Sequence, residues 1–126
     1  MSSVEDHNPE MLEVLINVRD YVERLTVGCT TIRESFQGGD TERGNALLAE
    51  FLEGVSWVIE AFTLSRPVQE EHGVLLDIEN LNEALKPVIE AMENQDYGLI
   101  GDVMEFEVQP VLRNWADELE KISSTD

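Results

Sequence analysis

The feature that most constrains the fold is an unbroken heptad of apolar residues near the start of the chain. Eight side chains follow one another at spacings of 4, 3, 4, 3, 4, 3 and 4: Met11, Leu15, Val18, Val22, Leu25, Cys29, Ile32 and Phe36. This pattern places them on one face of an α-helix, as in helices that pack lengthwise against others. Asn8 as N-cap and Pro9 at the first helical position predict its start, and Gly38-Gly39 predicts its end.

Three further segments repeat this periodicity, and turn residues separate them. Asp40 or Thr41 is the expected N-cap of the first of these segments, and the expected core stripes of the other two include Leu75, Met92 and Val111. Pro67 disfavours the helical conformation of the residue before it and so predicts the end of the second helix, with a short extra turn opening at Pro67 as an alternative. Pro87 and Pro110 fall inside the last two segments and predict a kink or a break there. We expect helices over residues 9–37, 41–65, 74–94 and 97–122, with frayed termini at 1–7 and 123–126.

These segments predict a single all-α domain over residues 1–126. No stretch of the chain alternates polar and apolar residues with a period of two, which argues against a sheet. Four helices joined mostly by short turns predict an antiparallel up-down-up-down four-helix bundle. A chain of 126 residues suffices for one core without a disulfide or metal to hold it together.

The charge of the chain limits its partners. It has 27 acidic residues against 8 lysines and arginines, a formal net charge of −19. Nucleic acids and anionic membranes are therefore not expected as partners, because both attract clustered basic residues. Of the acidic residues, 15 lie in residues 67–126 together with only 3 bases, so a basic partner would be drawn to that half. The acidity also has a simpler interpretation, since high net charge favours solubility by itself.

The compartment that the sequence predicts is the cytoplasm. Cys29 is the single cysteine, so no disulfide within the chain is possible. The longest run without a charged residue, 25–32, is far shorter than a membrane-spanning helix. The first residues are acidic and lack the apolar segment of a signal peptide.

No catalytic, cofactor or metal site is expected, and the chain is predicted not to be an enzyme. A di-iron carboxylate site needs two Glu-x-x-His motifs, but the residue three before His72 is Gln69, and His7 precedes the first predicted helix. Calcium-loop, phosphate-loop and nucleophile-elbow patterns are also missing from the sequence. Cys29 lies on the apolar stripe, where a thiol serves as a small core residue rather than as a nucleophile.

One acidic residue leaves two interpretations open. Asp102 and Glu105 are expected on solvated helix surface. Glu107 lies about 60° from Met104, at the edge of the apolar stripe of its helix. It is either a glutamate that keeps its carboxylate in water, or a partly buried acid bonded to an arginine or tyrosine, with a raised pKa.

Apolar residues on a second face of two helices are the main functional clue. Leu99, Val103, Phe106 and Pro110 form a stripe with spacings of 4, 3 and 4, roughly 100–160° from the core stripe. Trp57 similarly points about 160° away from the stripe of its own helix. Either the fourth helix touches two neighbours within the chain, or these five residues form an interface with another molecule.

The same segments carry a resemblance to a known family. Gly54-x-x-Trp57 and a C-terminal pattern resemble a family of small, acidic, all-helical bacterial proteins of unknown function, which implies no activity and no site residues. The C-terminal pattern consists of Asp96, Tyr97, Leu99, Asp102, Glu105, Glu107, Pro110, Leu112 and Trp115. The chain is also similar to flagellar export chaperones in size, acidity and helicity only, which is an analogy of fold class.

The function that we predict is a non-enzymatic cytoplasmic interaction or adaptor protein. It would self-associate as a homodimer or dock a protein partner through the second apolar stripe. One alternative is a small acidic secretion-type chaperone for a helical client. The other is an enzyme or metal protein centred on Glu107, which would need a closed pocket with converging polar groups.

Overall fold

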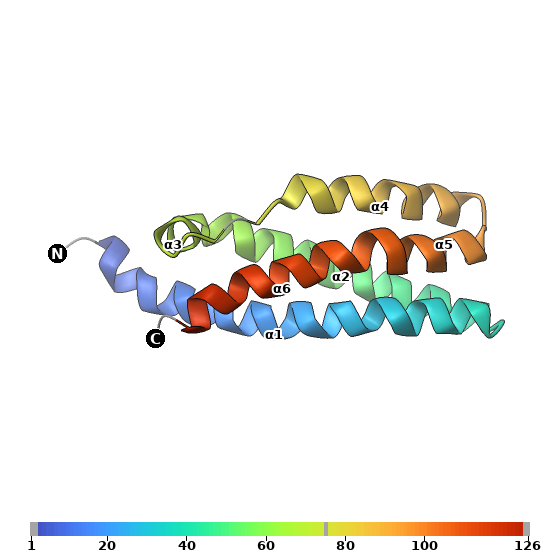
Figure 1. The fold of residues 1–126 in the computed structure, drawn as a ribbon, viewed down its shortest axis with the longest axis horizontal. Helices are drawn as coiled ribbons and strands as arrows, with labels where there is room; N and C mark the ends of the chain where they lie inside the picture. Colours follow the sequence, from blue (N-terminus) through green and yellow to red (C-terminus); the bar gives the residue numbers. More distant parts are fainter. Residues whose placement is uncertain (1–2, 75, 125–126) are drawn as a thin grey trace.

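The structure, a computed structural model, describes residues 3–74 and 76–124, and every regular element in those ranges is a helix (Figure 1). The all-α prediction is confirmed for them. None of these helices is long and apolar enough to cross a membrane. In chain order the elements are α1 (Ser3–Gln37), α2 (Thr41–Leu64), α3 (Arg66–Glu71), α4 (Ile78–Glu93), α5 (Tyr97–Val103), the π-helix η1 (Met104–Val108) and α6 (Gln109–Ser124).

α1 is the longest element and carries its heptad stripe into the core. From Leu15 to Phe36 every residue of the stripe is buried, and Met11 is partly buried. Each large apolar side chain that is fully buried in this way contributes about 1.5–3 kcal/mol to stability. The stripe therefore forms one side of the hydrophobic core along most of the length of α1.

The predicted start of α1 is wrong. The helix begins at Ser3, so Asn8 is not its N-cap and residues 3–7 are helical. Pro9 therefore lies inside α1. It removes one backbone N–H donor, and the helix continues because the backbone hydrogen bonds on either side remain. At the other end, residues 123–124 are also helical rather than frayed, because α6 extends to Ser124. Residues 1–2 and 125–126 lie outside the described residues.

The connection between α1 and α2 follows from two residues. Gly39 has a φ of +83°, a left-handed conformation that glycine adopts without strain. The carboxylate of Asp40 then accepts the backbone N–H of Arg43 at 3.1 Å and caps α2. Glycines on α2 let the two helices approach closely, because a Cβ at Gly44 would collide with Phe36.

The end of α2 is capped by a side chain of the next element. The short helix α3 has Pro67 near its start, in agreement with the alternative of an extra turn there. The side-chain amide of the buried Gln69 donates to the carbonyl of Phe62 at 2.6 Å and to the hydroxyl of Ser65 at 3.1 Å. These bonds satisfy polar groups that would otherwise be left without partners where α2 ends.

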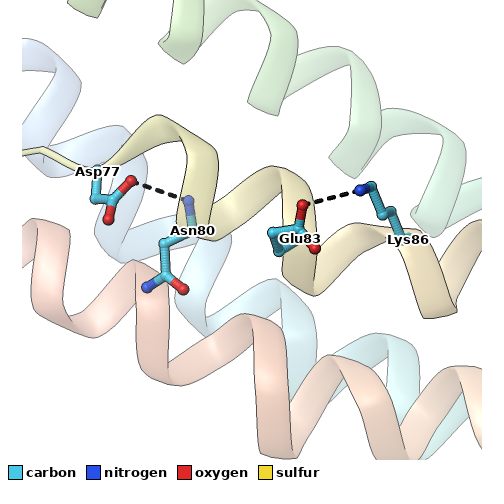
Figure 2. Close-up of polar contacts among 4 residues, drawn as sticks. All are labelled: Asp77, Asn80, Glu83 and Lys86. Carbon is cyan, nitrogen blue, oxygen red and sulfur yellow. Dashed lines mark hydrogen bonds and ion pairs between the residues drawn. The ribbon is translucent and has the colours of Figure 1, made fainter.

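A capping hydrogen bond and an ion pair, both at the surface, stabilise the start and the middle of α4 (Figure 2). The carboxylate of Asp77 accepts the backbone N–H of Asn80 at 3.0 Å and caps the helix. One turn further, the ammonium of Lys86 lies 2.8 Å from a carboxylate oxygen of Glu83, and this hydrogen bond raises the pKa of Lys86. Pro87 lies inside α4 without breaking it.

One expected core residue of this segment lies on the surface, and another is not described. Met92 is exposed on α4 rather than buried. Leu75 lies outside the described residues.

The last helical stretch contains a π-helix just before Pro110. The backbone N–H of Gln109 bonds to the carbonyl of Met104, five residues back, which defines the wide turn. Pro110 has no N–H, and its ring needs room beside the carbonyl of Phe106, so a widened turn accommodates it without a break. The buried residue in the first turn of α6 differs from the one expected. Leu112 is fully buried, whereas Val111, the expected core residue, is only partly buried.

The long helices lie along the long axis of the molecule (Figure 1). α1 packs against α2, α5 and α6, and α5 also packs against α4. The connections at 38–40 and 94–96 lie at one end of the molecule, while α3, the start of α1 and the end of α6 lie at the other (Figure 1). α5 and η1 therefore have neighbours on two sides. The position of these neighbours determines which apolar residues of α5 and η1 stay exposed.

Candidate functional site

Three residues of the predicted second stripe stay exposed and form an apolar surface on α5, η1 and α6. Leu99 keeps 44% and Phe106 67% of its surface in solvent, and Pro110 is exposed as well. Their spacings of seven and four residues keep them on one side of the helical stretch. We call Leu99, Phe106 and Pro110 the Phe106 face.

Val103, the fourth residue of that stripe, belongs to the core. It is only 5% exposed, so its prediction as an interface residue is wrong. α5 packs between α1 and α4 and therefore buries a wider arc of its surface than a helix with one neighbour. The α1 side is very close, since a Cβ at Gly101 would lie 3.2 Å from the Cγ of Arg33. The second stripe thus divides into an internal part and an exposed part.

Of the two acidic residues of η1, Glu107 takes the solvated one of its two interpretations, and Glu105 departs from expectation. Glu107 is exposed, so the interpretation as a partly buried acid is wrong. Glu105, expected on solvated surface, is the partly buried one, and its carboxylate pairs with the guanidinium of Arg33 on α1 at 2.7 Å. The packing of η1 against α1 brings Glu105 to Arg33, and the sequence does not show this contact.

A buried glutamine next to this ion pair, Gln109, was not predicted from the sequence. The side-chain amide of Gln109 donates to the carbonyl of Thr26 at 2.8 Å and to the hydroxyl of Thr30 at 3.0 Å. Gln109, Glu105 and their partners on α1 form a paired polar contact that fixes η1 and α6 against α1. In the sequence, the burial of Gln109 is indicated only by its position five residues after the core residue Met104, which is a weak signal.

Trp57 lies on another surface, along the contact between α1 and α2. Its ring is 48% exposed and meets the ring of Tyr21 edge-on, with centroids 5.4 Å apart. Tyr21 in turn packs over Gly54, where a Cβ would collide with its hydroxyl group. The Gly54-x-x-Trp57 pair therefore has a structural basis, since the glycine makes room for the tyrosine on which the tryptophan rests.

The position of Tyr21 on α1 separates Trp57 from the Phe106 face. Tyr21 lies about 120–180° around α1 from Thr26, Thr30 and Arg33, which contact η1 and α6. The predicted interface residues thus fall on two surfaces, on opposite flanks of α1.

The residues with nucleophilic or ligand chemistry are not gathered in one place. Burial raises the pKa of the Cys29 thiol to about 12, which keeps it protonated and unreactive at neutral pH. The Nδ1 atom of His72 lies 3.1 Å from the carbonyl of Val68 in its own helical turn. Within residues 3–74 and 76–124, no three His, Cys, Asp or Glu side chains are grouped so that they could hold a metal ion.

The fold and these surfaces define an acidic all-helical domain that exposes large apolar side chains on several of its helices. The chain belongs to the family described as "Domain of unknown function (DUF8042)", whose model matches residues 13–118. The resemblance to a small family of unknown function is therefore confirmed. The chain is also 27% identical over 99 residues to an uncharacterized protein of Treponema pallidum (strain Nichols).

That match covers 73% of this chain and 50% of the relative, so the chain spans about half the length of the curated relative that it matches. No solved structure matches the chain significantly.

Proposed function

We propose that this chain is a non-enzymatic interaction protein of the cytoplasm that pairs with a second copy of itself through the Phe106 face. In this proposal an antiparallel up-down-up-down four-helix bundle is the scaffold, and α5, η1 and α6 present the contact residues. The function is the assembly of a two-fold homodimer rather than the conversion of a substrate.

The exposure of the Phe106 side chain carries the proposal. Removing 67% of a phenylalanine surface and 44% of Leu99 from water on each of two chains favours association. In a two-fold dimer the same patch of both subunits meets itself, so one apolar face suffices. The exposed carboxylates of Asp102 and Glu107 would approach their counterparts, so we expect added salt to strengthen the pairing. The alternative of a site centred on Glu107 has no comparable support, because that residue is exposed.

The decisive experiment is the variant Phe106→Glu, with mass in solution measured by sedimentation over a range of concentrations. We expect wild-type protein to approach the mass of a dimer as concentration rises, and the variant to remain a monomer, because the new carboxylates would be buried without partners. The melting curve should change little, since exposed substitutions shift stability by about 0.5 kcal/mol or less.

Leu64→Glu is the matched control, because Leu64 is also 67% exposed but lies at the end of α2. It adds the same charge to the molecule and should leave the dimer intact. A wild-type chain that is monomeric at every concentration would overturn the proposal. So would a dimer that Leu64→Glu disrupts and Phe106→Glu does not.

A further inference from the structure

Two neighbouring hollows lie along the contact between α1 and α2, away from the Phe106 face. The larger one, of about 550 Å³, is formed where the beginning of α1 meets the end of α2. Its apolar lining consists of Met11, Val14, Trp57, Ala61 and Leu64. The smaller one, of about 330 Å³, lies further along α1 and is lined by apolar groups of Tyr21, Leu25, Val27, Leu47 and Phe51.

The two hollows follow one another along the contact between α1 and α2. Tyr21 lines the smaller hollow and Trp57 the larger one, and their rings are in contact with centroids 5.4 Å apart. Four residues along this groove are large, apolar and exposed, namely Val14, Val27, Trp57 and Leu64. We call this feature the α1–α2 groove.

The length of the groove suits a helix. The lining residues of the two hollows span Glu10 to Ile32 on α1, with none between Val14 and Tyr21. At 1.5 Å per residue this span is about 33 Å, or the length of roughly 20 helical residues. On α2 the lining residues Trp57, Ala61 and Leu64 follow at spacings of four and three, as along the seam of packed helices. An amphipathic helix laid in a groove places its own apolar residues at the same spacings.

The edges of the larger hollow are acidic. Each of its exposed apolar residues follows an exposed glutamate by four positions, and residues four apart lie one above the other on a helix. The three pairs are Glu10 with Val14, Glu53 with Trp57, and Glu60 with Leu64. Its lining contains two glutamates and no lysine or arginine, whereas the smaller hollow has Arg24 and Glu50.

We propose that the α1–α2 groove binds a basic amphipathic helix of a partner protein, with the apolar side of that helix against Trp57 and its lysines or arginines beside Glu10, Glu53 and Glu60. Charge complementarity selects this occupant. A second copy of this chain carries the same net charge of −19 and has 27 acids for 8 bases, so it has no basic helix to offer. An anionic membrane surface would be repelled by the same glutamates.

The test uses the full chain and three synthetic peptides of about 20 residues, the length that fits the groove. One peptide has leucines at helical spacing and lysines elsewhere, the second has the same composition in scrambled order, and the third has glutamate in place of lysine. The emission of Trp57 reports on binding, because it is 48% exposed and should shift to shorter wavelength when covered. Trp115, at 1% exposure, should stay unchanged.

We expect the periodic leucine-lysine peptide to bind about tenfold or more tightly than the other two, since anchor residues in a groove dominate affinity. By calorimetry, Trp57→Ala and Leu64→Ala should each weaken that binding about tenfold. Glu60→Gln should weaken it at low salt and have less effect at high salt. Ile89→Ala on α4 is the matched control, because Ile89 is 47% exposed, close to the 48% of Trp57, and it should leave binding unchanged.

Three results would overturn the inference. Equal affinity for the periodic and scrambled peptides would mean non-specific attraction to an acidic surface. Loss of binding with Ile89→Ala and not with Trp57→Ala would place the peptide elsewhere. A self-associated wild-type chain that Trp57→Ala converts to monomer would make a second copy the occupant. Because the groove and the Phe106 face are on opposite flanks of α1, these results are independent of the proposed self-association.

Discussion

At the scale of single residues, the burial of Cys29 has a direct chemical consequence. We predict that the thiol of the folded protein resists alkylation and reacts only after unfolding, because burial raises its pKa from 9.0 to about 12 and the thiolate is the reactive form. Labelling with a thiol reagent at pH 8, with and without denaturant, measures this. Rapid labelling of the native protein would contradict it and make Cys29 a candidate nucleophile.

The same raised pKa predicts how stability depends on pH. Below pH 9 the thiol is neutral in both the folded and the unfolded chain. Between pH 9 and about 12 the unfolded chain loses the thiol proton while the folded chain keeps it, so Cys29 lowers the free energy of unfolding as pH rises. Denaturant unfolding of wild type and Cys29→Ala should therefore show a difference that shrinks across this window.

At the scale of elements, Gln109 links η1 and α6 to α1. We predict that Gln109→Ala lowers the free energy of unfolding by about 1–3 kcal/mol, because the carbonyl of Thr26 and the hydroxyl of Thr30 lose their partner in a partly buried place. Denaturant unfolding followed by circular dichroism provides the measurement.

Glu107→Ala is the control for that measurement, since Glu107 lies two residues away on η1 and is exposed. Its effect should stay within about 0.5 kcal/mol. Equal losses for both variants would mean that η1 is destabilised by any substitution and that the hydrogen bonds of Gln109 have no special role.

At the scale of the whole molecule, we predict that the chain folds without a metal ion. Its core is a continuous set of buried apolar side chains drawn from all the long helices. Thermal melting of the native protein with and without a chelator should coincide within about 2 °C, since 1 kcal/mol already shifts the midpoint by several degrees. A large drop on chelation would show that a metal contributes to the fold.

Local patterns in the sequence were sufficient for the core face of α1 and for several helix ends. The heptad from Leu15 to Phe36 is buried as a whole, and Asp40 caps α2 as one of the two expected residues. These features depend on residues within a few turns of one another, so periodicity and capping chemistry predict them. The start of α1 was missed because Pro9 allows a helix to begin there without requiring it.

Only tertiary packing determined which apolar surfaces are exposed to solvent. The sequence determined that the fourth helical segment has two apolar faces, but only the placement of α5 between α1 and α4 buried Val103 and left Phe106 in water. The packing of η1 against α1 likewise gave Glu105 its ion pair with Arg33 and left Glu107 exposed. A helical pattern specifies the apolar arc of one helix. Which part of that arc meets a neighbour depends on helices distant in the chain, and so the α1–α2 groove and the Phe106 face became visible only in three dimensions.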